Sequence, residues 1–287
     1  MQKFFYSFLI LVVVILSGCN KSDLVQGQKA PEEVTKSREI VLNVADGFDA
    51  QVETKATAIT TVPSSLYWGA TTGSAGSETS KWAVENKTGI TSTIATGKYQ
   101  TSTPTTYNYY VSNQTFSIGA AKTTITVANN STDVLSARVA SNSTAPSVPL
   151  GHIFCRAKMG AHSNGSGSGE ISSVTYTIAS NGAVSGTAGV FNMTTNAWES
   201  ASASLSSTSI TTTSDLYLIP GTYTITANYT VTNGDNIQNL TKSATVTLDQ
   251  GKINTIRCTL PRVSVDPITI SVSVTAWGDV NKDILLS

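Results

Sequence analysis

Runs in which apolar residues alternate with threonine or serine recur along this chain from residue 39 onward. The clearest run extends from Ile268 to Ala276, and another extends from Thr222 to Val231. Because successive side chains of a β-strand point to opposite faces, each run predicts a strand with one apolar and one polar face. The pattern predicts an all-β chain of antiparallel β-sandwiches in which each sheet turns one face toward water.

Turn residues separate these runs. The segment from Asn233 to Asn236 has the sequence Asn-Gly-Asp-Asn, and it follows the run that ends at Val231. Such a turn predicts a β-hairpin whose second strand contains Ala244 and Val246. Helical periodicity is weak throughout, and the best short helix candidate is Lys81 to Lys87.

The first residues form a segment of a different kind. Lys3 precedes an apolar run from Phe4 to Leu16, which has the length of a signal-peptide core and is short for a transmembrane helix. The run ends in Leu-Ser-Gly-Cys19, and small residues directly before a Cys resemble the cleavage site of bacterial lipoproteins. We therefore expect residues 1–18 to be a lipoprotein signal peptide, with a lipid on Cys19 and a tether over residues 19–38. A plain secretory signal is the alternative.

Two stretches are candidates for a domain boundary. Asn142 to Pro149 contains two prolines and interrupts the alternation, and Ser163 to Gly169 is rich in Gly and Ser. We place the boundary in the first stretch, because it leaves domains over residues 39–147 and 148–287, each the size of a seven-stranded sandwich. The Gly/Ser stretch then becomes a hairpin loop.

Two cysteines remain after Cys19. Cys155 shares the apolar face of its run with Ile153, and Cys258 shares a face with Ile256. We expect both thiols to be buried packing groups. A disulfide between strands is the alternative, and export would permit it.

Catalytic and metal-binding patterns are not recognisable. His152, on the polar side of its strand, and His162 have no Cys or carboxylate at ligand spacing, so we expect structural or surface histidines. Asp279, Asn281 and Asp283 match the first oxygen positions of a calcium loop, but the glycine at its sixth position is missing. No G-x-S-x-G motif occurs. Since 18 basic and 18 acidic residues balance, nucleic acid is not an expected partner. We expect no enzyme activity, no metal and no cofactor.

Short motifs follow the lipoprotein signal along nearly the whole chain. They are Glu39 to Val44, Thr54-Lys55-Ala56-Thr57, Tyr107-Asn108-Tyr109-Tyr110, Thr132 to Ala137, Val148-Pro149-Leu150-Gly151-His152, Cys155-Arg156-Ala157-Lys158, Leu216 to Pro220, Leu248 to Lys252, and Ile270 to Trp277. Their order and spacing resemble the fimbrillin family, the subunits of type V pili in anaerobic Gram-negative bacteria.

This resemblance implies two tandem transthyretin-like β-sandwich domains and a structural subunit of a surface fimbrium that supports adhesion. In that family a trypsin-like protease removes the first strand after a basic residue. The matching positions here are Lys55 and Ala56, where the best-studied members have Arg in place of the lysine, and Arg38 is a second candidate. The first strand, residues 39–55, is then removable.

The family assembles by strand exchange, in which a neighbouring subunit's strand fills the opened groove. For this chain the resemblance assigns the donor to the terminal tail, residues 278–287. The side chains expected to take part are Ile40, Leu42, Val44, Val280, Ile284 and Leu286.

The implied partners are other pilin subunits, in a homo- or hetero-polymer, the outer membrane through the lipid on Cys19, and surface ligands of host or bacterial origin. The implied location is the cell outer membrane and the surface fimbrium. An alternative function is a surface glycan-binding lipoprotein, which needs aromatic side chains clustered on one exposed platform.

Overall fold

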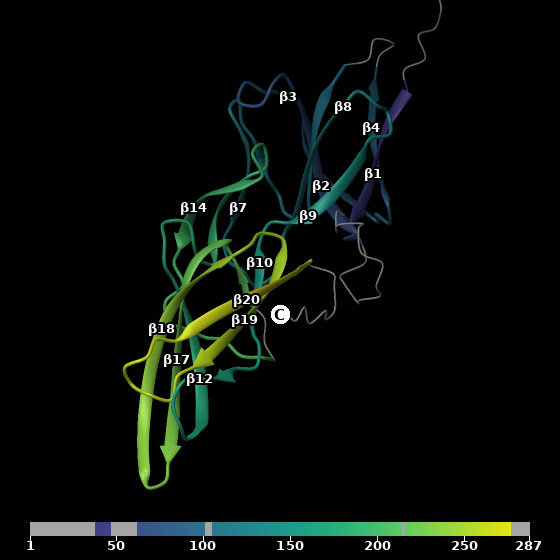
Figure 1. The fold of residues 1–287 in the computed structure, drawn as a ribbon. Coiled ribbons are helices and arrows are strands. Elements are labelled where there is room, and N and C mark those ends of the chain that lie inside the picture. The colour runs from purple at the N-terminus through teal and green to yellow at the C-terminus, as the bar shows by residue number, and fades with distance from the viewer. Residues whose placement is uncertain (1–37, 47–61, 101–104, 214–215, 277–287) are drawn as a thin grey trace, which may run out of the picture. The chain divides into compact units, whose positions relative to one another are not determined.

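All regular elements in the described part of the chain are β-strands (Figure 1). In the computed structural model the described residues are 38–46, 62–100, 105–213 and 216–276. The prediction of an all-β chain is confirmed, and no helix within these ranges is long and apolar enough to cross a membrane. The helix candidate Lys81 to Lys87 was wrong: it lies in β3 (Thr79–Thr88), where pairing with β2 (Ser65–Thr72) outweighs the weak local pattern.

The first sheet has the strand order β3-β2-β5-β8-β9-β1-β4. β8 and β9 pair only through Leu135 with His152 and Ser136 with Gly151, so the sheet divides there into two parts. Side chains from both parts meet in one hydrophobic core, which makes this a β-sandwich. The remaining bounds are β1 (Arg38–Asp46), β4 (Thr93–Gln100), β5 (Tyr107–Ser112), β8 (Leu135–Ser141) and β9 (Ser147–His152).

Strand β5 departs from the expected pattern of one dry and one wet face. All six of its residues are buried. Tyr107 and Tyr109 point into the core shared with β1, whereas Tyr110 packs into a second core on the other side. The expectation of a water-facing side was wrong for this strand, because another sheet covers that side.

The covering sheet has the order β14-β13-β7-β6 and combines distant parts of the chain. Phe191 of β13 pairs with Ile125 of β7, and both side chains are buried in the core that receives Tyr110. The pairing of β7 with β13 therefore joins residues on opposite sides of the predicted boundary between residues 147 and 148. The pairing of β1 with β9 does so as well. The bounds are β6 (Ser117–Ile118), β7 (Thr123–Val127), β13 (Ala188–Asn192) and β14 (Ala197–Ala203).

The remaining strands form two further sheets around a third core. One sheet has the order β11-β19-β10-β16, with β20 paired to β19, and the other has the order β15-β12-β17-β18. The bounds are β10 (Cys155–Met159), β11 (Ser163–Asn164), β12 (Glu170–Ser180), β15 (Thr208–Ser209), β16 (Leu216–Leu218), β17 (Gly221–Asn233), β18 (Asn236–Leu248), β19 (Lys252–Leu260) and β20 (Thr269–Ala276).

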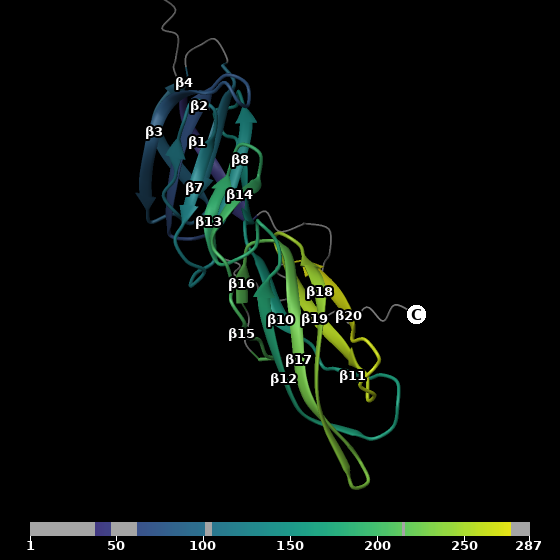
Figure 2. The ribbon, with the colours of Figure 1, turned by 90° about the vertical axis from the view of Figure 1, so that its left-hand side faces the viewer.

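The predicted hairpin is confirmed as β17 and β18, which pair residue for residue from Gly221 with Leu248 to Asn233 with Asn236 (Figure 2). Gly234 has a φ of 61° in the turn, a conformation that glycine adopts without steric cost. The hairpin is longer than the alternation suggested, because the stretch between Ile237 and Ser243 also pairs.

The sheets are mixed rather than purely antiparallel, which corrects the sequence prediction. β1 runs parallel to β9, and β19 runs parallel to β10 and β11. Parallel neighbours need a long connection between them. Each of these pairs joins strands far apart in the sequence, and alternation within a strand carries no information about such pairing.

Cys155 and Cys258 are both free and buried, as the packing interpretation predicts. Burial raises the pKa of Cys155 to about 12 and that of Cys258 to about 11. The Cys155 thiol donates a hydrogen bond to the Leu218 carbonyl at 3.2 Å. Neither thiol is therefore activated for nucleophilic chemistry.

We expect the two thiols of a Cys19→Ala chain to resist a thiol reagent at pH 8 in the native protein and both to react in denaturant. Because unfolded cysteines ionise near their ordinary pKa of about 8.5, the contribution of the two thiols to stability should be constant below this pH and fall as pH rises toward 12. Reagent titration and unfolding curves across this range measure both effects. A blocked pair in denaturant would contradict the assignment.

Candidate strand-exchange site

Strand β1 occupies an interior position of the first sheet, between β9 and β4 (Figure 1). It pairs in parallel with β9 and antiparallel with β4. A strand with a neighbour on each edge leaves a gap in the sheet when it is removed. The sequence prediction that residues 39 onward begin with a strand is confirmed at β1.

Three side chains of β1 enter the core of the sandwich. Ile40 and Leu42 are 0% exposed and Val44 is 4% exposed. The residues between them, such as Asn43, are exposed or only half-buried. The structure thus brings together the three predicted groove residues, and their removal would uncover three adjacent apolar pockets.

Main-chain hydrogen bonds hold β1 on both sides. The N–H of Val41 donates to the Thr144 carbonyl at 2.8 Å, and that of Asn43 to the Pro146 carbonyl at 2.9 Å. On the other edge, the N–H of Val44 donates to the Ser92 carbonyl at 2.8 Å. These bonds do not depend on side-chain identity, so any strand with the right alternation could form their equivalents.

Side-chain hydrogen bonds add to this ladder. The Thr96 hydroxyl, which is buried, donates to the Ile40 carbonyl at 2.6 Å. Next to it, the N–H of Gly97 donates to the Glu39 carboxylate at 3.1 Å. The register between β1 and β4 shifts between Glu39 and Val41, so the ladder is irregular at the start of β1.

The other predicted site residues are placed as follows. Arg38 is exposed and is the first residue of β1, where it pairs with Gln100. The remaining predicted residues lie outside the described ranges: Cys19, Lys55, Ala56, Val280, Ile284 and Leu286.

Sequence reasoning missed a buried polar network around Glu78. Its side chain is 0% exposed and accepts hydrogen bonds from the Thr71 hydroxyl at 2.9 Å and the Tyr110 hydroxyl at 2.5 Å. Arg138 pairs with the same carboxylate at 3.1 Å. The partners lie up to 60 residues apart, so no local sequence signal marks the network.

The network alters the titration of two of its members. Burial raises the pKa of Tyr110, and the hydrogen bond to Glu78 raises it further. Burial lowers the pKa of Arg138, but its bonds to Tyr110 and Glu78 outweigh this effect and leave the pKa raised. Tyr110 therefore remains a neutral hydroxyl and Arg138 a cation at neutral pH.

His152 lies on a buried face rather than on the predicted polar side. Its side chain is 1% exposed, and its Nδ1 hydrogen bonds with the Asp133 carboxylate. This contact supports the expectation of a structural histidine. Within the described ranges, no group of three or more His, Cys, Asp and Glu side chains is arranged to hold a metal ion.

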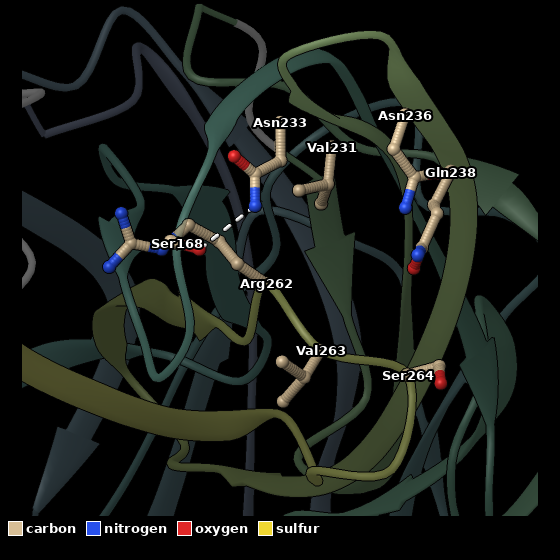
Figure 3. A pocket seen from close by; sticks show the side chains of 8 residues that line it. All are labelled: Ser168, Val231, Asn233, Asn236, Gln238, Arg262, Val263 and Ser264. Carbon is tan, nitrogen blue, oxygen red and sulfur yellow. Dashed lines mark hydrogen bonds between the residues drawn. The ribbon is translucent and has the colours of Figure 1, made fainter.

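A small pocket lies beside the turn of the β17 and β18 hairpin (Figure 3). Its volume is about 210 Å³, and amide side chains of Asn233, Asn236 and Gln238 line it together with Val263. Arg262 lies at its edge and donates to the carbonyls of Gly165 and Gly169, while Asn233 donates to the Ser168 hydroxyl at 3.0 Å. These bonds join the loops around the hairpin.

Comparison with solved structures identifies the fold. A fimbrial protein from Bacteroides vulgatus matches with a TM-score of 0.51 and 14% identity, over 84% of this chain and 99% of that one. A proposed cell adhesion protein from Parabacteroides distasonis matches with a TM-score of 0.52 and 12% identity, over 86% and 99%. No protein family model and no curated protein matches the sequence.

These matches extend over nearly the whole of both related structures. At 14% and 12% identity they establish a shared fold. The chain therefore resembles fimbrial and cell adhesion proteins in structure, in agreement with the resemblance of its motifs to fimbrillins.

Proposed function

We propose that this protein is a non-enzymatic structural subunit of a surface fimbrium, assembled by exchange of β1 for a strand of a neighbouring subunit. The observation that carries the proposal is the interior position of β1, with Ile40, Leu42 and Val44 buried in the core. Removal of this strand opens a groove that is complementary to a strand with alternating apolar side chains. The shared fold with a fimbrial protein supports the same role.

The position of β1 discriminates between the two candidate cleavage sites. Cleavage after Arg38 would leave residues 39–46 attached to the chain and paired in the sheet, so the groove would stay filled. Cleavage after Lys55 would separate the whole of β1 from the rest. Lys55 and Ala56 are therefore the processing site that we propose.

The donor must supply apolar side chains at three alternate positions, as Ile40, Leu42 and Val44 do. In the tail, Ile284 and Leu286 fit two of these alternate positions. Lys282, two residues before Ile284, would lie on the same face of the strand and is charged. We retain residues 278–287, with Val280, as the first donor candidate.

Strand β20 is a second donor candidate. Its Ile270, Val272 and Val274 match all three positions. Among the described strands it pairs only with β19, and Val274 is 39% exposed. A strand held along one edge is released at lower cost than an interior strand.

Trypsin treatment of the mature chain tests the proposal. Cleaved protein should form oligomers that resist SDS and appear as ladders of bands on a gel. Main-chain hydrogen bonds and pocket contacts both form between the subunits of such oligomers. Lys55→Ala should abolish the ladders, whereas Arg38→Ala, the matched control, should leave them unchanged. If cleaved protein stays monomeric even with partner subunits present, the proposal fails.

Deletion of residues 278–287 separates the two donors. If the tail is the donor, the deleted chain should be cleaved but stay monomeric, as size-exclusion chromatography would detect. Ladders equal to those of the full chain would contradict the tail and assign the donor to β20. Either result is interpretable only when the cleaved full chain assembles.

Anchoring is proposed at Cys19, with the outer membrane as the site of the precursor. The Cys19→Ala chain should incorporate no labelled fatty acid and should leave the membrane fraction, because the acyl chains supply the membrane affinity. Metabolic labelling and fractionation measure both. Unchanged labelling would rule out lipid attachment at this residue.

The alternative of a glycan-binding lipoprotein is less well supported by the aromatic side chains. Trp68, Tyr109 and Tyr110 are fully buried, and Trp82 packs against Tyr107 in a tilted arrangement with ring centroids 4.8 Å apart. Among the described aromatic residues, Tyr99 is the one that is exposed, at 56%. A single exposed ring does not form a stacking platform.

A further inference from the structure

A second pocket lies between β8, β9 and the turn that joins β13 to β14. Its volume is about 330 Å³, larger than the hairpin pocket of Figure 3. The wall contributed by β8 and β9 includes Arg138 and Gly151, and the turn contributes Thr194, Thr195 and Asn196. This wall lies where β8 and β9 separate beyond their two paired positions.

Arg138 lines this pocket, and two N–H groups of its guanidinium are not used by hydrogen bonds within the described residues. A guanidinium carries five N–H donors. Nε donates to the Tyr110 hydroxyl at 3.1 Å, and Nη2 donates to Glu78 at 3.1 Å and to the Asn108 side-chain oxygen at 2.9 Å. The two hydrogens on Nη1 have no protein acceptor among the described residues. Because three other bonds fix the group, its free edge is pre-oriented.

The turn adds neutral hydrogen-bonding groups beside this cation. The Thr194 hydroxyl contacts the Tyr110 hydroxyl at 3.2 Å and accepts from the N–H of Thr123 at 3.1 Å. The Thr195 hydroxyl is exposed and has no hydrogen-bond partner within the described ranges. Asn196 adds an amide, whose oxygen accepts from Gln250 at 3.5 Å.

We propose that this pocket binds a carboxylate that belongs to a hydroxyl-rich ligand, an acidic sugar residue. The carboxylate accepts from Nη1 of Arg138, and the ligand hydroxyls bond with Thr195 and Asn196. The volume is at the lower end of the range for ligand sites, which suits one sugar ring. None of the residues that line this pocket belongs to β1, and the proposal does not depend on strand exchange.

Binding of sodium D-glucuronate to the full, uncleaved Cys19→Ala chain tests the proposal by isothermal titration and saturation-transfer NMR. We expect saturable binding, with methyl glucoside at least tenfold weaker because it lacks the carboxylate. N-acetylaspartate amide, which represents an acidic peptide side chain, should also be at least tenfold weaker. Absence of glucuronate binding would overturn the proposal, and equal binding of the aspartate probe would overturn the sugar assignment.

Variants locate the binding. Replacing Arg138 alone leaves a buried carboxylate without its cation, so the pair is replaced together as Glu78→Gln with Arg138→Gln. Gly151→Val keeps the ion pair and adds volume at a position where a Cβ meets nothing closer than the Ser136 carbonyl at 3.9 Å. The double variant and the Gly151→Val variant should each weaken glucuronate binding at least tenfold.

The matched control is Arg262→Gln, which removes a guanidinium at the edge of the hairpin pocket and should leave glucuronate binding unchanged. Circular dichroism confirms that each variant is folded. Unchanged binding in the folded Gly151→Val chain would assign the ligand to another place and overturn the site. Loss of glucuronate binding in the Arg262→Gln chain, with binding retained in the other variants, would also overturn the site.

Discussion

A chain that begins at Ala56 is expected to lose most of the stability of its first sandwich. It lacks Ile40, Leu42 and Val44, and burial of each such side chain contributes roughly 1.5 to 3 kcal/mol. Their combined loss of about 4.5 to 9 kcal/mol is comparable to the whole stability of a typical domain, about 5 to 15 kcal/mol. Thermal unfolding, followed by circular dichroism, should show a transition at a much lower temperature than in the full chain.

A synthetic peptide with the sequence of residues 38–46 should reverse this loss. Binding of the peptide to the folded state raises the unfolding temperature in proportion to the logarithm of peptide concentration. The matched control peptide carries Leu42→Asp, which places a carboxylate in a fully buried position, and it should have no effect. Equal rescue by both peptides would show that the groove does not select its strand by side-chain pattern. An unchanged unfolding temperature in the truncated chain would show that β1 contributes little.

Arg138→Ala is expected to have the largest effect of any single substitution outside β1. The Glu78 carboxylate would remain at 0% exposure without its cation, and breaking a buried ion pair typically costs about 3 to 5 kcal/mol. Urea unfolding should show a large decrease in midpoint. The paired replacement Glu78→Gln with Arg138→Gln should cost clearly less, because it leaves no buried charge. Equal losses in the two variants would indicate that lost packing, and not an unpaired charge, destabilises the protein.

The parts of the fold that sequence predicted are those coded by neighbouring residues. Alternation identified β17, β18 and β20, and the Asn-Gly-Asp-Asn turn fixed the hairpin. The apolar residues of β1 were identified for the same reason. A strand pattern states which side chains share a face, and a buried face follows from it.

The parts that sequence did not predict depend on residues far apart in the chain. Strand β5 is buried on both faces, because the sheet that covers Tyr110 comes partly from β13, some 80 residues later, so the local sequence of β5 did not predict this burial. The parallel pairing of β1 with β9 has the same origin. Glu78 and Arg138 have no periodic signature, because an ion pair between distant loops and strands leaves no regular spacing.

The neighbours of β1 run in opposite directions, since β9 is parallel to it and β4 is antiparallel. An incoming strand in either orientation would therefore form one parallel and one antiparallel ladder. The backbone of the vacant slot consequently has no strong preference for the direction of insertion. Directionality must come from the shapes of the three pockets, read in the order Ile40, Leu42, Val44, and from the irregular register near Glu39. The head-to-tail polarity of an assembled fibre would then depend on side-chain sizes together with this register, and reversing the order of apolar residues in a donor would weaken its preference for one direction of insertion.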